Sequence, residues 1–285
     1  MTTLPDVIGV IGGGRMGAGI AHVFARAGAS ALVIERDDQA AGQARARLED
    51  GVAKAAERDA SMDADALLGR LAVSTEYDAL AAAGLVVEAV PESFDLKVDA
   101  LTRAERVLGD GAWLATNTSS LSVADLAEHL QRPERFCGLH FFNPVPPSAL
   151  VEVVLTARTA PELRDRAVEW VTALEKSAIV VNDAPGFASS RLGLAIALEA
   201  MRMVEEGVAS PHDIDAAMVL GYRHATGPLR TSDLVGLDVR LGIAEYLHET
   251  LGERFAPPQI LRDKVAAGEL GRKTGRGFFE YPPGR

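Results

Sequence analysis

The sequence predicts an α/β protein in which a doubly wound, mostly parallel sheet is followed by an all-helical second domain. Three observations lead to this fold class. Short apolar runs alternate with helical patterns from residue 4 to about residue 183, as strands and crossover helices do in parallel sheets. A glycine-rich turn follows the first run. No convincing strand follows residue 183, so we expect two domains, at 1–184 and 185–285.

The expected strands are short runs rich in Val, Ile, Leu and Ala. They lie at 7–11, 31–34, 71–73, 85–90, 113–116, 136–142, 150–155 and 178–181. Helical spacing of apolar residues behind capping acids and serines predicts helices between them. These helices lie at 38–58, 63–71, 95–107, 122–130 and 161–174, with Asp37 or Asp38, Asp63, Asp95 and Ser122 as caps.

The pattern becomes purely helical after Asp183-Ala-Pro-Gly186. One helix of roughly 20 residues fits 187–206, and Gly207 ends it. Ser210 and Pro211 then form a cap and a first helical residue. Further helices are expected at 213–220, 232–251 and 257–267.

The glycine-rich turn gives the first indication of a ligand. Gly12, Gly14 and Gly17 form G-x-G-x-x-G between the first strand and a helix with Met16 and Ile20 on its apolar side. The first glycine permits a tight turn, the second lets a pyrophosphate approach the backbone, and the third lets the helix pack close to the sheet. The helix N-terminus, with Arg15 and Met16, then faces the phosphates. This order is typical of a Rossmann-type dinucleotide-binding domain, although the motif alone also fits a turn without a ligand.

Glu35 ends the second apolar run, close to the distance from Gly17 at which dinucleotide-binding domains carry an acid. An acid near this position accepts hydrogen bonds from a ribose hydroxyl. Because a carboxylate would repel the 2′-phosphate of NADP, we expect NAD as the cofactor. Arg36 is the one neighbour that could favour NADP.

Composition narrows the remaining classes of function. The formal net charge is −11, which argues against a nucleic-acid or anionic-membrane surface. Cys137 is the single cysteine, so no intrachain disulfide and no cysteine-rich metal site are expected. No apolar run is long enough for a transmembrane helix, and the N-terminus lacks the pattern of a signal peptide. We therefore expect a cytoplasmic protein without a metal.

Polar side chains at two strand ends are the candidates for catalysis. They lie in Asn117-Thr-Ser-Ser120 and His140-Phe-Phe-Asn143, and ligands bind at carboxyl strand ends in such sheets. Glu152, on the expected strand that follows His140, could orient that histidine as a general base. This chemistry suits oxidation of a secondary alcohol, in which His140 takes the proton of the substrate hydroxyl and Ser119 hydrogen-bonds the oxygen of that hydroxyl.

Alternatives for these side chains are a hydrogen-bonded core histidine and a serine at a helix entry. The remaining histidines show no metal-ligand spacing, and we expect them to be structural or solvated: His22, His129, His212, His224 and His248. A G-x-S-x-G or Cys/His nucleophile pattern is absent, which disfavours a hydrolase.

The chain resembles the L-3-hydroxyacyl-CoA dehydrogenases, including the bacterial 3-hydroxybutyryl-CoA dehydrogenases. The matching motifs run in family order along nearly the whole chain. They are the segments 12–21, 117–121, 140–146, 150–154, 183–187, 227–228, 233–238 and 271–278. The resemblance implies reversible oxidation of an L-3-hydroxyacyl-CoA by NAD. It also implies a C-terminal domain that completes the acyl-CoA cleft and forms a homodimer.

The resemblance also implies roles for individual residues. His140 is similar to the catalytic base of the family, Glu152 to the acid paired with it, and Ser119 to a serine that contacts substrate and cofactor. Family contacts to NAD fall on Glu92, Lys97, Asn143 and Lys273, and Asn143 also belongs to the expected catalytic set.

The sequence departs from the family pattern at two places. The family usually has Asn where Ser190 stands, and we expect Ser190 to contact substrate. The family also often places Ser and Lys on the helix after the second strand, where they contact CoA. This chain has Gly51 and Arg58 at these two positions. Arg58 is the expected contact to a CoA phosphate, with a solvated helix charge as the alternative.

Two other functions remain open from the sequence. One is an L-gulonate 3-dehydrogenase type of enzyme, which shares these motifs but acts on a free sugar acid. The other is a catalytically idle NAD-binding or structural protein, like the lens crystallins recruited from this superfamily. The presence of Ser119, His140, Glu152 and Asn143 argues against an idle protein.

Overall fold

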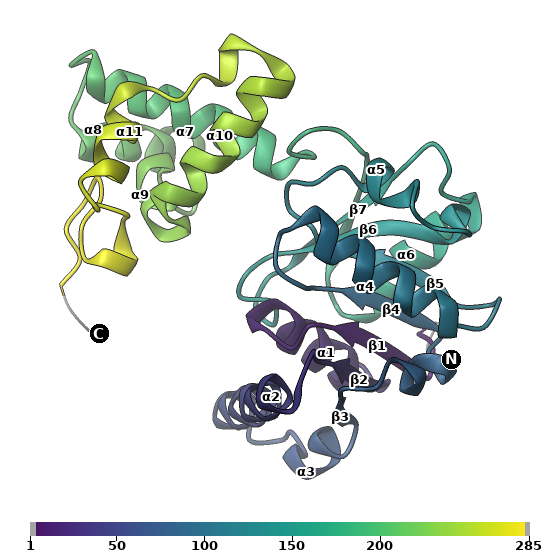
Figure 1. Cartoon of the computed structure of the whole chain (residues 1–285). Helices are drawn as coiled ribbons and strands as arrows, with labels where there is room; N and C mark the ends of the chain where they lie inside the picture. Colours follow the sequence, from purple (N-terminus) through teal and green to yellow (C-terminus); the bar gives the residue numbers. More distant parts are fainter. Residues whose placement is uncertain (1–3, 283–285) are drawn as a thin grey trace. The chain divides into compact units, whose positions relative to one another are not determined.

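The structure is a computed structural model, and it describes residues 4–282. It divides into two compact units, one ending at Ala184 and the other beginning at Pro185. Figure 1 shows the sheet and its helices in the first unit, and helices in the second. This confirms the predicted fold class, a Rossmann-type α/β domain followed by a helical one.

One sheet of eight strands forms the centre of the first unit, in the order β3-β2-β1-β4-β5-β6-β7-β8. Its strands are β1 (Val7–Ile11), β2 (Ser30–Ile34), β3 (Leu71–Ser74), β4 (Leu85–Glu88), β5 (Trp113–Thr116), β6 (Phe136–Phe141), β7 (Leu150–Leu155) and β8 (Ser177–Asn182). All neighbours are parallel except β6 and β7. The chain leaves β1 toward β2 on one side and reaches β4 on the other. This switch point is where ligands bind in open α/β sheets.

Burial explains why the central strands read as continuous apolar runs. Every residue of β4, β5 and β6 is buried, because helices cover both faces of a parallel sheet. The edge strands β3 and β8 are only partly buried. Two acidic residues of the sheet are nevertheless fully buried, Glu88 at the end of β4 and Glu152 in β7.

Three helices of the first unit begin at polar caps that the sequence predicts. The helices of this unit are α1 (Arg15–Arg26), α2 (Asp38–Arg58), α3 (Ala64–Leu68), α4 (Phe94–Val107), α5 (Val123–Ala127) and α6 (Pro161–Ala173). Asp37, Asp63 and Ser122 each accept a backbone N–H of the first turn. The cap predicted at Asp95 is wrong. Helix α4 starts one residue earlier, so Asp95 lies in its first turn, where a negative charge complements the helix dipole.

The second unit consists of helices around its own apolar core. They are α7 (Ser189–Glu205), α8 (Pro211–Ala216), α9 (Pro228–Val235), α10 (Leu237–Leu251) and α11 (Gln259–Ala266). The single helix predicted at 232–251 is wrong, because Gly236 adopts a φ of 109° and separates α9 from α10. Buried Asp233 accepts the backbone N–H groups of Phe278 and Phe279, which ties the C-terminal segment to α9.

Two structural features are absent from the described part of the chain. No helix within residues 4–282 has the length and apolar character needed to cross a membrane. No group of three or more His, Cys, Asp or Glu side chains in the same range is arranged to hold a metal ion.

Candidate active site

The glycine turn has the backbone geometry that a dinucleotide phosphate requires. Gly12 follows β1 with a φ of 91°, and a Cβ there would lie 2.9 Å from the carbonyl oxygen of Ala89. A Cβ at Gly17 would collide with the carbonyl oxygen of Gly12, whereas Gly14 has no atom within 4 Å of its Cβ position. Gly14 is also the N-cap of α1, and no side chain caps that helix. The turn therefore leaves both space and amide groups for a phosphate.

Glu35 stands beside this turn, at the end of β2. Its Oε1 accepts the backbone N–H of Gly13 at 2.6 Å, and its Oε2 accepts that of Arg36 at 3.2 Å. The side chain of Arg36 is 85% exposed and pairs with Asp37 at 3.0 Å. A fixed carboxylate with a neighbouring arginine engaged elsewhere fits a ribose with free hydroxyls, as NAD has.

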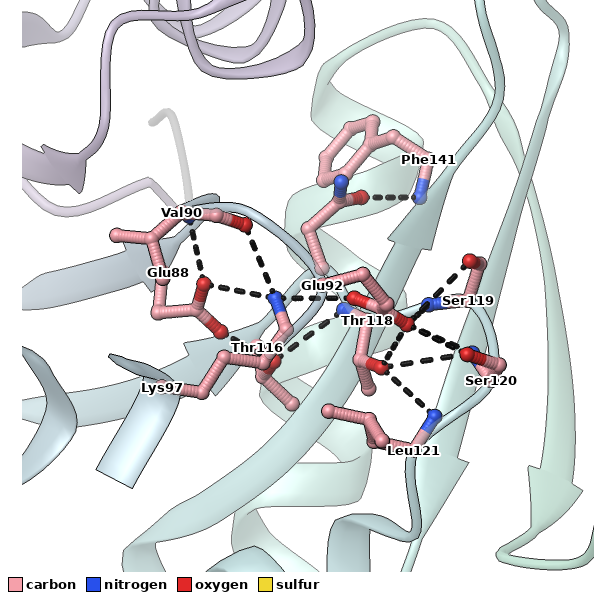
Figure 2. A network of polar contacts seen from close by, with 11 residues as sticks. Glu88, Val90, Glu92, Lys97, Thr116, Thr118, Ser119, Ser120, Leu121 and Phe141 are labelled. Carbon is pink, nitrogen blue, oxygen red and sulfur yellow. Dashed lines mark hydrogen bonds and ion pairs between the residues drawn. The ribbon is translucent and has the colours of Figure 1, made fainter. Parts of the chain in front are cut away.

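Glu92 organises the polar loop that follows β5 (Figure 2). Its Oε1 accepts the Thr118 hydroxyl at 2.6 Å, the backbone N–H of Ser119 at 2.9 Å, and both the N–H and the hydroxyl of Ser120 at 2.9 Å. Burial alone would raise the pKa of Glu92, but the Lys97 charge and these hydrogen bonds outweigh it and lower the pKa to about 2. The ionised carboxylate thus fixes the backbone at Ser119.

Lys97 lies under this loop and is 1% exposed. Its Nζ donates to Glu88 Oε1 at 2.9 Å and to the Val90 carbonyl at 3.3 Å, and it pairs with Glu92 Oε2 at 3.2 Å. These partners, which Figure 2 shows, account for all three N–H groups of an ammonium. In this structure Lys97 therefore holds Glu92 in place, and the direct NAD contact that the resemblance implies stays a prediction.

His140 and Glu152 are brought together by the antiparallel pairing of β6 and β7, in which they stand directly opposite each other. The distance between His140 Nδ1 and Glu152 Oε2 is 2.7 Å. Glu152 is fully buried, and 8% of the His140 side chain is exposed. The ring of Phe142 lies 4.6 Å from the imidazole, centroid to centroid. A buried carboxylate on Nδ1 fixes the ring and its tautomer.

The carboxyl ends of the parallel strands β5 and β6 lie side by side, so Ser119 and His140 belong to the same end of the sheet. Thr116 pairs with Gly138, and the Asn117 side chain accepts the backbone N–H of Phe141 at 2.8 Å. Ser119 and Asn143 both lie at this end, Ser119 exposed and Asn143 next to an exposed proline.

Three expected site residues belong to other elements than these groups. Arg58 is the exposed last residue of α2. Ser190 and Lys273 belong to the second unit. Ser190 is the second residue of α7, and Lys273 pairs with both carboxylate oxygens of Asp238 at 2.6 Å.

Sequence reasoning assigned no role to several polar residues of the site. The network beneath Ser119 includes Asn117, Thr118 and Glu88. At the glycine turn, Arg47 of α2 donates to the Gly13 carbonyl at 3.2 Å. The acid Glu88 at the end of an otherwise apolar run was a detectable signal. Arg47 gave none, because its partner lies 34 positions away in the sequence.

The fold and the glycine turn with its acid define the class of protein, a dinucleotide-binding protein of the Rossmann type. The chain belongs to the 3-hydroxyacyl-CoA dehydrogenase family. Residues 7–184 match the family's NAD-binding domain and residues 186–281 its C-terminal domain. The cofactor is accordingly NAD.

Individual relatives agree with this assignment. A probable 3-hydroxybutyryl-CoA dehydrogenase of Deinococcus radiodurans is 39% identical over 96% of this chain and 99% of its own. The human mitochondrial hydroxyacyl-coenzyme A dehydrogenase is 36% identical over 95% of this chain and 90% of its own. The crystal structure of FadB2 from Mycobacterium tuberculosis superposes with a TM-score of 0.92 at 40% identity, covering 98% of this chain and 99% of FadB2.

Proposed function

We propose that this enzyme oxidises L-3-hydroxyacyl-CoA reversibly to 3-oxoacyl-CoA, with His140 and Glu152 moving the hydroxyl proton. The observation that carries the proposal is the 2.7 Å contact between His140 Nδ1 and buried Glu152 Oε2, at the strand end beside Ser119. NAD, when bound, accepts the hydride. A charged carboxylate on Nδ1 keeps the N–H on that nitrogen and leaves Nε2 as the basic one.

The neighbouring groups support each step of the proton transfer. After Nε2 takes the hydroxyl proton, the negative charge of Glu152 stabilises the imidazolium. Ser119, on a backbone held by Glu92, would donate a hydrogen bond to the developing carbonyl oxygen. Asn143 would position the same substrate group from the end of β6 and contact the cofactor. The two phosphates and the ribose of NAD would be held by the glycine turn and the acid beside it, which comprise Gly12, Gly14, Arg15, Met16, Gly17 and Glu35.

The test is a spectrophotometric screen of 3-oxoacyl-CoA reduction by NADH across acyl chain lengths. Relatives named for 3-hydroxybutyryl-CoA favour a four-carbon acyl group as the best substrate. A solved diketoreductase with a TM-score of 0.85 at 29% identity supplies the contrasting substrate, a free dicarbonyl. L-gulonate, assayed in the oxidising direction with NAD, covers the sugar-acid alternative. Turnover of either free compound without turnover of any CoA thioester would contradict the proposal.

A homodimer through the second unit is part of the proposal. Large apolar side chains are exposed there on several helices, and such surface marks interaction sites. They include Leu192, Leu220, Tyr222, Leu234 and Val239. Sedimentation at micromolar concentration should give twice the monomer mass.

The cytoplasm remains the proposed location, since the only cysteine, Cys137, is a buried free thiol.

We expect NAD to be preferred over NADP by a large ratio of kcat/KM, because the Glu35 carboxylate would repel a 2′-phosphate. Steady-state rates with both cofactors at saturating thioester measure the ratio. Arg36→Ala is the matched variant and should leave the ratio unchanged, since Arg36 pairs with Asp37. Equal efficiency with NADP in the wild type would overturn the role of Glu35.

Ser190→Ala should lower kcat/KM by roughly 3–30-fold, as loss of one hydrogen bond of about 1 kcal/mol scale would. The proposal is that the Ser190 hydroxyl contacts substrate directly or through a water. Ser190→Asn should remain active, because an amide offers both a donor and an acceptor on a longer arm. Unchanged kinetics in Ser190→Ala would instead assign position 190 to helix packing.

A further inference from the structure

A buried lysine holds the turn that joins β6 to β7. Lys176 lies between the end of α6 and the first residue of β8, and it is 8% exposed. Its Nζ donates to the backbone carbonyls of Val145 at 2.8 Å, Pro146 at 3.3 Å and Ser148 at 2.5 Å. An ammonium has three N–H groups, and these three bonds match them. None of the three goes to a carboxylate, so this cation binds backbone rather than an acid.

The end of α6 places Lys176 beside the turn. Glu175 adopts a φ of 58°, in the left-handed region, and the backbone N–H of Lys176 donates to the Val171 carbonyl at 3.1 Å. This is the pattern of a Schellman-type helix end. The next residue, Ser177, donates its backbone N–H to the Ala149 carbonyl at 2.6 Å. Backbone hydrogen bonds on both sides therefore fix the position of the lysine.

The turn can form few hydrogen bonds of its own. It comprises residues 143–149, and three of these, Pro144, Pro146 and Pro147, have no backbone N–H. Carbonyl groups that are buried without a partner cost free energy, and Lys176 supplies donors that the prolines lack. Burial lowers the pKa of Lys176, so the charged ammonium is kept here at a cost that an apolar side chain would avoid.

A second contact fixes the turn against α1, the helix that begins at the glycine turn. Val145 is 2% exposed, and a Cβ at Gly19 of α1 would lie only 2.8 Å from the Cβ of Val145. The turn is thus held by α1 and by Lys176. Asn143 is its first residue and follows His140 by three positions. The position of the Asn143 carboxamide therefore depends on how firmly the turn is held.

We propose that Lys176 is a positioning residue, which holds the turn after β6 so that Asn143 meets the substrate beside His140. The inference rests on the proposed function, in which Asn143 positions the reacting group of the substrate. Lys176 acts only through the turn, because carbonyl oxygens already engage its N–H groups. Without these bonds the carboxamide would occupy a range of positions, and misplacing a positioning group by about 1 Å can cost a large factor in rate.

The test is a double-mutant cycle between Lys176→Met and Asn143→Ala, with acetoacetyl-CoA and NADH as substrates. Lys176→Met keeps an unbranched side chain and removes its donors, and kcat should fall roughly 5–30-fold. In the Asn143→Ala background the same substitution should change kcat by less than about twofold, because the group that Lys176 positions is gone. The melting temperature should fall equally in both backgrounds, since the same three hydrogen bonds are lost.

Arg135→Leu is the matched control. Arg135 also binds loop carbonyls, from Nε to Ala112 at 2.7 Å and from an Nη group to Gly111. It directly precedes β6, however, whereas Asn143 lies beyond the other end of that strand. Arg135→Leu should lower the melting temperature and leave kcat unchanged.

Lys176→Arg tests for rescue, because a guanidinium also donates to carbonyl oxygens. A hollow of about 470 Å³ borders Lys176 and leaves room for the larger group. The kcat of this variant should be within about threefold of the wild type, as expected when donors to the turn are kept. A kcat as low as that of Lys176→Met would contradict the role of the donors.

Equal losses of kcat from Lys176→Met in the two backgrounds would overturn the inference, because Lys176 would then not act through Asn143. An unchanged kcat in Lys176→Met would overturn it as well, and so would a silent Asn143→Ala. Where Lys176→Met does not fold, Lys176→Gln keeps one NH₂ group for the carbonyls and gives the same cycle with a smaller loss. Failure of the proposed function would look different, since the wild type itself would then reduce no 3-oxoacyl-CoA.

Discussion

His140→Gln should lower kcat by about 10²–10⁴-fold and leave NADH affinity close to that of the wild type. Loss of a general base typically has this cost, equivalent to about 3–5 kcal/mol of activation free energy. The glutamine amide can fill the space, but it cannot take the hydroxyl proton. NADH fluorescence titration measures cofactor binding independently of turnover, and a stopped-flow assay of the hydride step measures the loss.

A second histidine–glutamate pair in the same chain provides a matched control. His248 Nε2 lies 3.1 Å from Glu253 Oε1, but the pair is largely exposed and belongs to the second unit. His248→Gln should leave kcat unchanged. If His140→Gln retained wild-type kcat, or if it lost NADH binding in parallel with turnover, His140 would not be the base.

Glu152→Gln should cost a comparable factor in kcat, although it preserves the shape of the side chain. Two effects act together. The amide removes the negative charge that stabilises the imidazolium, and its NH₂ group can donate to Nδ1, which would place the ring proton on Nε2 and block the base. Steady-state kinetics with the 3-oxoacyl-CoA substrate, in parallel with a melting curve, separate this loss from unfolding.

Glu253→Gln is the control for Glu152→Gln and should be silent, because its partner His248 takes no part in the proposed reaction. A silent Glu152→Gln would show that the 2.7 Å contact is only structural. In that case the proposal for His140 would have to stand without an orienting partner.

Several features of the fold could be predicted because their physical cause is local. The positive φ of Gly12, the caps at Asp37, Asp63 and Ser122, and the apolar strands all depend on residues a few positions apart. Errors arose where two local solutions compete. At α4, the N-cap is Ser93, two residues before the predicted cap at Asp95. At Gly236, a glycine inside an apolar helical pattern could either continue or end the helix, and its φ of 109° ends it.

The proposed catalytic pair was predictable as a pair of residue types, but its contact was not. The sequence places His140 and Glu152 on successive strands, and only the register of β6 against β7 puts them opposite each other. A shift of one residue would turn the carboxylate to the other face of the sheet. Lys97 illustrates another case, since the resemblance implied a contact with NAD, whereas only the structure shows the three protein groups around its buried ammonium.

The sequence by itself determined the fold class, the family and the choice of NAD, because these follow from glycine conformation, apolar periodicity and motifs in a fixed order. Only the tertiary structure decided which groups meet. Glu92 binds the loop at Ser119 across 27 positions of the chain, and the ring nitrogens of buried His22 have no hydrogen-bond partner within residues 4–282. The physical reason is that hydrogen bonding and burial depend on distances in space, which a linear pattern fixes only within a strand or a helix.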